Sequence, residues 1–210
     1  MRIALLWGSV LGVAAIAGVT IALSRGSGAP AATMQPAAPI TAVATWGARM
    51  RRAPGFHLAD QHGASLSLAS LRGRPVIVTF IDPVCRNLCP LEAKVLTRAV
   101  AGLPAADRPA IVSVSVNPPA DTPANFRQDA AHWRLDGAWR WGVGTERQLA
   151  AVWHSYGIEV LVAKKVVAGV TVRSVAHTEG AFVIDRSGYE RALFLYPFSA
   201  GDIQQSLRTI

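Results

Sequence analysis

Residues 75–100 read PVIVTFIDPVCRNLCPLEAKVLTRAV, and this stretch decides the fold class. Its first seven residues, 75–81, are an almost unbroken run of β-branched and aromatic side chains, which is typical of a strand buried on both faces. Leu91 to Val100 then carry apolar residues at helical spacing, and Pro90 suits the first turn of that helix. A buried strand followed directly by a helix indicates a layered α/β domain.

Strands and helices alternate through the rest of the chain. Their order predicts a mixed central sheet flanked by helices, in a folded domain spanning residues 54–210. Residues 158–175 are expected to form a hairpin or an irregular excursion. The other expected strands are 56–60, 65–69, 110–116, 139–143, 181–185 and 192–197, and the other expected helices are 123–133, 146–156 and a short one from about 201.

The first 53 residues differ in composition from this domain. Residues 3–23 contain no charge and no proline, and their length as a helix matches a hydrocarbon core of about 30 Å. The apolar region of a signal peptide is shorter, about 7–15 residues, so residues 1–25 are expected to be a membrane anchor rather than a cleaved signal. Residues 26–53 are rich in Ala, Pro and Gly and predict a flexible tether. We therefore expect an exported domain.

The net charge of +8 comes from arginines scattered along the chain. No groove pattern of alternating aromatic and basic residues accompanies them, so we expect no nucleic-acid binding. Attraction to anionic lipid headgroups or to an acidic partner explains the excess of positive charge more simply.

Cys85 and Cys89 are the only cysteines in the chain. Four residues apart at a strand-to-helix junction, they can place both sulfurs on one side of a helical turn. The helix N-terminus and the nearby Arg86 would favour the thiolate form. Such a pair can chelate one soft ion, such as Cu(I) or Zn(II), but two cysteines cannot hold an iron–sulfur cluster. A metal site, a redox pair and a structural disulfide therefore all remain open.

A histidine is the natural further ligand for a soft metal ion. His177 lies just before the strand expected at 181–185, in what we expect to be a loop, and is the best placed of the five histidines. We expect the other four to be solvated or to pack: His57, His62, His132 and His154.

Several pieces of sequence recur in the order and spacing of a known family. They are 55–60 (GFHLAD) with Gly63, 71–75 (LRGRP), Cys85-x-x-x-Cys89-Pro90, 117–118 (NP) with 121–123 (DTP), and His177 before 182–185 (FVID) and Gly188. With them, residues 54–210 resemble the SCO/SenC proteins. These are copper-binding assembly factors for cytochrome oxidase, with a thioredoxin-like fold and usually an N-terminal membrane anchor.

The resemblance implies a thioredoxin-like domain in which Cys85, Cys89 and His177 together bind one copper ion, Cu(I) or Cu(II). It implies a metallochaperone that passes copper to the copper-site subunit of cytochrome oxidase or exchanges it with another copper chaperone. Ligand exchange needs no general base, so we do not expect an ordinary enzyme. The expected location is the inner (cytoplasmic) membrane, with the domain on the periplasmic or extracytoplasmic side.

The sequence also departs from the family pattern. Arg86 stands where the family usually has proline, Asn87-Leu88 replace a usual acidic residue, and Ala176 replaces the aspartate that typically precedes the histidine. These changes remove negative charge near the site, so copper affinity or the preferred oxidation state is expected to differ.

The position of the prolines favours metal binding over disulfide exchange. Thioredoxin-like reductases generally carry a cis-proline opposite the cysteines, whereas this chain has no proline between Pro123 and Pro197 and offers His177 there instead. Two alternatives stay open: a thiol–disulfide oxidoreductase acting on partner cysteines, and an anchored interaction domain with a structural Cys85–Cys89 disulfide.

Overall fold

The computed structural model describes residues 41–135, 137 and 139–210, which form an α/β domain. The expected anchor, residues 1–25, and the first part of the expected tether, residues 26–40, lie outside these residues. Within the described part, no helix is both long and apolar enough to cross a bilayer.

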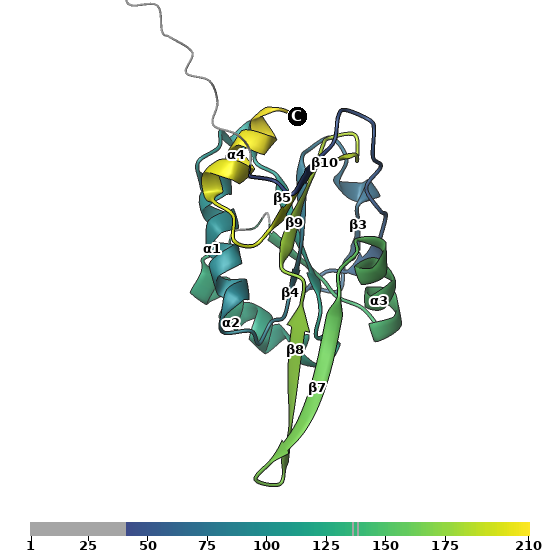
Figure 1. The fold of residues 1–210 in the computed structure, drawn as a ribbon, viewed down its shortest axis with the longest axis vertical. Helices are drawn as coiled ribbons and strands as arrows, with labels where there is room; N and C mark the ends of the chain where they lie inside the picture. Colours follow the sequence, from purple (N-terminus) through teal and green to yellow (C-terminus); the bar gives the residue numbers. More distant parts are fainter. Residues whose placement is uncertain (1–40, 136, 138) are drawn as a thin grey trace, which may run out of the picture. The chain divides into compact units, whose positions relative to one another are not determined.

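A six-stranded mixed sheet forms the centre of the domain (Figure 1). The strand order is β1-β10-β9-β4-β5-β6, in which β4, β5 and β6 run parallel while β9, β10 and β1 pair antiparallel. Its strands are β1 (Ala44–Thr45), β4 (Val76–Ile81), β5 (Ala110–Ser115), β6 (Trp139–Gly142), β9 (Gly180–Ile184) and β10 (Glu190–Leu195). Two hairpins stand apart from it: β2 (His57–Ala59) with β3 (Ser65–Ser67), and β7 (Val160–Val167) with β8 (Val170–His177).

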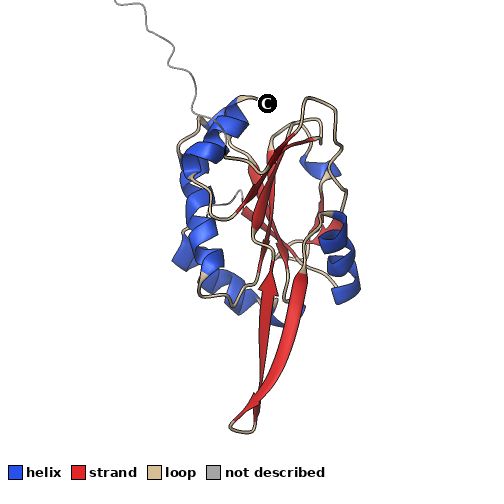
Figure 2. Cartoon of the chain, in the orientation of Figure 1, coloured by secondary structure: helices blue, strands red, loops and turns tan. Residues whose placement is uncertain are grey.

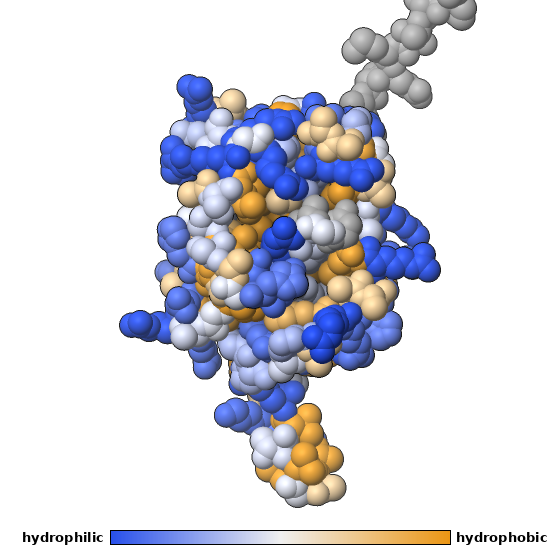
Figure 3. Space-filling view, turned by 180° about the vertical axis from the view of Figure 1, so that it is seen from behind, coloured by the Kyte–Doolittle hydropathy of each residue, from blue (hydrophilic) through white to orange (hydrophobic). Residues whose placement is uncertain are grey.

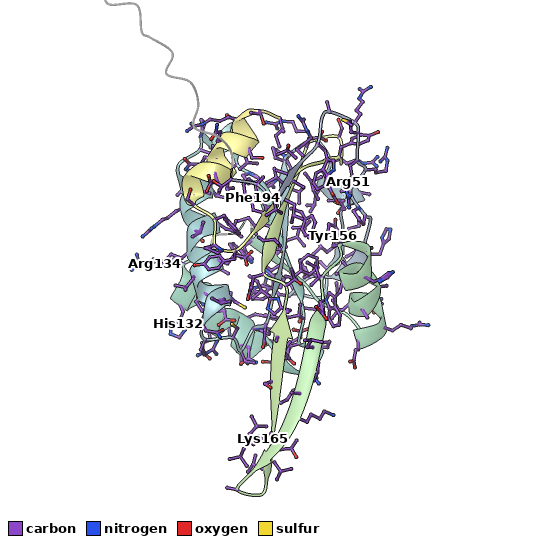
Figure 4. All side chains as sticks on the ribbon, in the orientation of Figure 1. Arg51, His132, Arg134, Tyr156, Lys165 and Phe194 are labelled. Carbon is purple, nitrogen blue, oxygen red and sulfur yellow. The ribbon has the colours of Figure 1, made fainter. Side chains whose placement is uncertain are left out.

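The helices cover both faces of this sheet (Figure 2). Helices α1, α2 and α4 pack on one face, and α3 packs with the β2–β3 hairpin on the other. Phe194 belongs to the first core and Tyr156 to the second, and Figure 4 shows them on opposite sides of the sheet. The helices are α1 (Leu88–Ala101), α2 (Pro123–Trp133), α3 (Glu146–Ser155) and α4 (Ala200–Arg208), with short 3₁₀ turns η1 (Ala69–Leu71), η2 (Ala105–Asp107) and η3 (Pro118–Ala120).

The run of residues 75–81 becomes the fully buried strand β4, as its composition predicts. All six of its residues are buried because β4 lies between β5 and β9 and has a helical layer on each side. Two helix starts also follow from the sequence. The Thr122 side chain caps α2 by accepting a hydrogen bond from the Asn125 N–H, and Pro123 is the first residue of that helix. Thr145 forms a capping box with Gln148 at the start of α3.

The folded domain begins earlier than the expected Pro54. Strand β1 pairs with β10, and the backbone N–H of Ala53 donates to the carbonyl of Gly188 at 3.1 Å. Residues 41–53 therefore contact the domain, although they were expected to belong to the tether. A two-residue strand has no measurable alternation, and β1 exists because the edge of β10 offers it backbone partners.

The hairpin expected in residues 158–175 is confirmed, and it begins and ends two residues later than expected. Its register runs from Val160 opposite His177 to Val167 opposite Val170, across a turn at Ala168-Gly169. The expectation that His177 lies in a loop is wrong, because it is the last residue of β8. Cross-strand pairing extends the strand beyond the point where the apolar pattern ends.

Candidate metal centre

The two cysteines follow β4 and occupy different positions. The chain turns at buried Asp82, whose carboxylate accepts from the Val84 N–H at 3.0 Å and whose carbonyl accepts from the Cys85 N–H at 3.0 Å. Asn87 caps α1 by accepting from the Leu88 N–H at 2.9 Å. Cys85 is thus half-buried in the turn, while Cys89, the second residue of α1, is fully buried.

The pair of thiols is electrostatically asymmetric. A hydrogen bond from the Cys89 thiol, with smaller help from the backbone N–H groups of Asn87 and Cys89, lowers the pKa of Cys85 to about 6 against the opposing effect of burial. The same Cys85–Cys89 hydrogen bond, together with burial, raises the pKa of Cys89. Cys85 is therefore the thiol that ionises first.

His177 reaches the cysteines from β8, 88 residues further along the chain. Its Nε2 lies 3.7 Å from the Sγ of Cys89. Its Nδ1 lies 3.1 Å from the backbone carbonyl of Thr178, which accepts a hydrogen bond from Nδ1 in the tautomer that is protonated there. In this tautomer Nε2 carries the lone pair that a metal-ligating imidazole requires, and Nε2 is the ring nitrogen nearer the Cys89 sulfur.

Glu179 is a site residue that the sequence reasoning missed. The Cys89 sulfur lies 3.4 Å from its Oε1, and the same oxygen lies 3.3 Å from Nε2 of His177. Its Oε2 is buried. The available signal was its spacing, because residues two apart on extended chain point to the same side.

A second carboxyl, Glu92, lies beneath Glu179. Glu92 is fully buried on α1, accepts from the Thr79 hydroxyl, and is hydrogen-bonded to Glu179. Burial raises the pKa of Glu92 well above its ordinary value, and burial also raises that of Glu179. The hydrogen bond between them favours the protonated form of Glu92 and the ionised form of Glu179.

Arg86 was expected to favour a thiolate directly, but its guanidinium turns elsewhere. It donates to the Cys85 carbonyl at 2.9 Å and pairs with the carboxylate of Asp129 on α2 at 3.3 Å. Burial raises the pKa of Asp129 to about 6, with Arg86 acting in the opposite direction. The contribution of Arg86 is thus to tie the cysteine turn to α2.

Among the residues that the structure describes, one group of three potential ligands comes together, with donor atoms within 4.8 Å of one another: Cys85, Cys89 and Glu179. His177 is not a member of that group, although it is close to Cys89 and Glu179. A cavity of about 210 Å³ borders the site and is lined by Cys85, His177 and Glu179 among others. The other four histidines are exposed, including His132 on α2, which Figure 4 labels.

These donors fit a soft or borderline metal ion. Two sulfurs and the Oε1 of Glu179 lie within 4.8 Å of one another, and the imidazole Nε2 of His177 lies beside Cys89 and Glu179. Both cysteines are free thiols, so the structure does not show the disulfide that a purely structural role requires.

The family described as SCO1/SenC matches residues 47–210. The chain belongs to the SCO1/SenC family. No curated protein sequence gives a significant match.

Solved structures of SCO1/SenC proteins resemble this one. ScoI of Bradyrhizobium japonicum with copper bound is 24% identical, with a TM-score of 0.59, over 75% of this chain and 98% of that one. Yeast Sco1 with copper bound is 17% identical, with a TM-score of 0.64, over 75% and 87%. The thioredoxin domain of a Bacteroides vulgatus thiol-disulfide oxidoreductase is 17% identical, with a TM-score of 0.54, over 80% and 97%. The expected thioredoxin-like fold is therefore confirmed.

Proposed function

We propose that this SCO1/SenC chain binds one copper ion through Cys85, Cys89 and His177 and hands it on by ligand exchange. The observation that carries the proposal is the approach of the imidazole Nε2 of His177 to within 3.7 Å of the Cys89 sulfur, from an element 88 residues away. Copper-bound structures of similar proteins support the choice of metal. Two thiolates and one imidazole suit Cu(I) in particular.

Metal binding in such a site is coupled to proton release. Both thiols must lose their protons to become ligands, and Cys89, with its raised pKa, holds its proton until the ion arrives. The Oε1 of Glu179 lies 3.4 Å from that sulfur and is placed to receive its proton. Glu179 also supplies a harder oxygen donor, which favours the divalent state of copper more than the cuprous state.

The proposed recipient is the copper-site subunit of cytochrome oxidase, or another copper chaperone, as family membership implies. The proposed location is the outer face of the cytoplasmic membrane, held there by residues 1–25. The apolar run of residues 3–23 supports this location.

Copper titration of the full chain in detergent tests the ligand set. With anaerobic Cu(I) and a competing chelator, the wild type should bind one ion per chain. His177→Ala should weaken binding by at least about tenfold, because one of three ligands is lost. His154→Ala removes an exposed histidine and should leave affinity unchanged. Equal affinities for the two variants would exclude His177 as a ligand.

Glu179 is tested by a different readout. Glu179→Gln should leave Cu(I) affinity close to that of the wild type, because the soft ligands remain. It should change the Cu(II) absorption and electron paramagnetic resonance spectra, since an oxygen donor to the divalent ion is altered. Unchanged Cu(II) spectra would show that Glu179 is not a ligand.

The difference in exposure between Cys85 and Cys89 favours a second candidate function, thiol–disulfide exchange. The thiolate of half-exposed Cys85 would attack a partner's disulfide and release one partner thiolate. Buried Cys89 would then attack the mixed disulfide, which frees the second thiolate and leaves a Cys85–Cys89 disulfide. The partner gains the two electrons that the pair loses. Reversible oxidation near about −200 mV with no metal binding would favour this function over copper transfer.

A further inference from the structure

The β7–β8 hairpin projects from the body of the domain (Figure 1). Every residue from 161 to 172 is exposed. A two-stranded ribbon without a covering layer is only marginally stable in water, so exposed apolar residues on it call for an explanation.

The far end of this hairpin is entirely apolar. It consists of residues 166–170 (VVAGV), in which Val166, Val167 and Val170 are 66%, 50% and 64% exposed. Figure 3 shows hydrophobic surface gathered at this end. The turn itself places Ala168 at φ 50°, a conformation that asparagine or glycine adopts more easily. An alanine there costs conformational energy and keeps the end free of polar groups.

The pairing register places valines on both faces of the hairpin end. Val167 pairs with Val170, so these two side chains share one face, and the neighbouring Val166 lies on the opposite face, where it pairs with Thr171. A hairpin that docks on a protein through one face keeps its other face polar. Exposed valines on both faces favour surroundings that enclose the end over a partner that covers one face.

Two lysines follow directly behind this apolar end. Lys164 and Lys165 are consecutive, so one lies on each face, and Figure 4 shows Lys165 near the far end of the hairpin. Residues 160–177 contain no Asp or Glu. An apolar end with a cationic collar matches the acyl boundary and the anionic headgroups of a membrane, which lie at successive depths.

The length of the apolar end fits that depth. From Lys165 to the turn at Ala168 is three residues, or about 10 Å at the rise of a strand. Apolar groups of interfacial segments enter the headgroup and acyl boundary to about 5–10 Å. We propose that residues 166–170 insert into the outer part of an anionic bilayer while Lys164 and Lys165 bind its headgroups.

Strand β8 connects this contact to the metal centre. It runs from Val170 to His177, about 23 Å at the rise of a strand. A membrane-seated hairpin would therefore hold the centre at a set height and orientation above the lipid. This consequence for copper rests on the proposed function, whereas lipid insertion does not.

Hydrogen exchange measured by mass spectrometry tests the insertion in the full chain. The chain is placed in nanodiscs of phosphatidylcholine alone or of phosphatidylcholine with phosphatidylglycerol. We expect exchange in the peptide covering 161–172 to slow about tenfold in the anionic discs, because local opening requires withdrawal from lipid. Equal exchange in the two kinds of disc would overturn the proposal.

Variants separate the apolar and cationic parts. Val166→Ser/Val167→Ser/Val170→Ser and Lys164→Gln/Lys165→Gln should each remove the slowing. The matched controls, Val43→Ser/Met50→Ser and Lys94→Gln/Arg147→Gln, change exposed residues elsewhere and should retain it.

Exchange in the buried strand β4 reports whether each variant is folded. Slowing that depends on the number of chains per disc, and not on lipid charge, would assign the hairpin to a second copy and overturn the proposal. Slowing that persists in both hairpin variants would also overturn it. Cu(I) stoichiometry measured on the same samples is expected to be unchanged, so failure of this proposal and failure of copper binding are distinguishable.

Discussion

Cys85 and Cys89 are four positions apart, yet their environments differ in every respect that governs thiol chemistry. Cys85 lies in a turn and is half-buried, while Cys89 lies inside a helix and is fully buried. The hydrogen bond between them stabilises the thiolate of Cys85 at the expense of Cys89. An incoming metal ion or disulfide therefore meets Cys85 first.

Alkylation across the pH range checks this asymmetry. The rate at which iodoacetamide modifies Cys85 should be half-maximal near pH 6, since only the thiolate reacts. Cys89→Ala removes the thiol donor and should move the midpoint to higher pH. Cys89→Ser keeps a hydroxyl donor, so the midpoint should return most of the way to the wild-type value. Identical midpoints for the wild type and the alanine variant would refute the assigned cause.

Glu179 supplies a carboxylate at a site from which the sequence appeared to have lost one. Ala176 replaces the usual acidic residue before the histidine, and residues 86–88 carry none. The Oε1 of Glu179 lies 3.4 Å from the Cys89 sulfur and 3.3 Å from Nε2 of His177. Negative charge near this site thus has a different source rather than being absent.

At the scale of elements, the segment from 41 to 53 is part of the fold. Besides β1, it contributes Arg51, whose Nε lies 2.5 Å from the carboxylate of fully buried Glu190 and whose guanidinium stacks over Trp46 at 4.7 Å. Burial raises the pKa of Glu190, and Arg51 opposes that rise. The ion pair therefore joins this segment to β10.

Replacing Arg51 should expose the dependence of Glu190 on this segment. Arg51→Met is expected to lower the free energy of unfolding by about 1–3 kcal/mol in urea titrations, because a buried carboxylate loses its partner while the exposed half of Arg51 limits the loss. Arg147→Met, an exposed arginine on α3, should change it by less than about 0.5 kcal/mol.

A double variant tests the mechanism. Arg51→Met/Glu190→Gln should recover part of the lost stability, since no charge is then left buried. A double variant as unstable as the sum of the two single variants would show that the pair is not coupled.

At the scale of the whole molecule, the centre forms where two distant parts of the chain meet. The turn after β4 and the start of α1 bring the cysteines, while the end of β8 brings His177 and the link between β8 and β9 brings Glu179. Because β9 pairs antiparallel with β4, the start of β9 lies at the end of β4 from which the cysteine turn departs. The antiparallel pairing in the mixed sheet thus assembles the site.

Buried carboxyls on this side of the sheet make stability depend on pH. Burial raises the pKa of Asp121 to about 7, although it accepts a hydrogen bond from Ser115. The folded state then retains a proton that the unfolded chain releases above about pH 4. Its contribution to stability is therefore present below about pH 4 and is lost as the pH rises to about 7.

Asp121→Asn should remove this component. As the pH rises from about 4 to about 7, the variant should gain stability relative to the wild type. The gain should be less than about 1.4 kcal/mol per pH unit, because the carboxyl is partly solvated. Urea titrations at several pH values measure the difference. Glu159→Gln changes an exposed carboxylate, and its plot of unfolding free energy against pH should run parallel to that of the wild type. A parallel plot for Asp121→Asn would contradict the assignment of this pH dependence to Asp121.

The sequence by itself determined the α/β class, the central strand at residues 76–81 and the helix starts at Thr122 and Thr145, because these depend on local composition and capping. It also identified the thiol pair, since only two cysteines exist. The approach of His177 to Cys89 was expected from family resemblance, and its distance came from the structure.

Only the tertiary structure decided the rest. The membership of Glu179 in the site, the pairing of Arg86 with Asp129 and the short strand β1 all depend on partners far away in the chain. So does the asymmetry of two identical side chains, because burial is a property of the packed molecule. Local patterns encode elements, whereas distances between elements follow from the topology of the sheet that joins them.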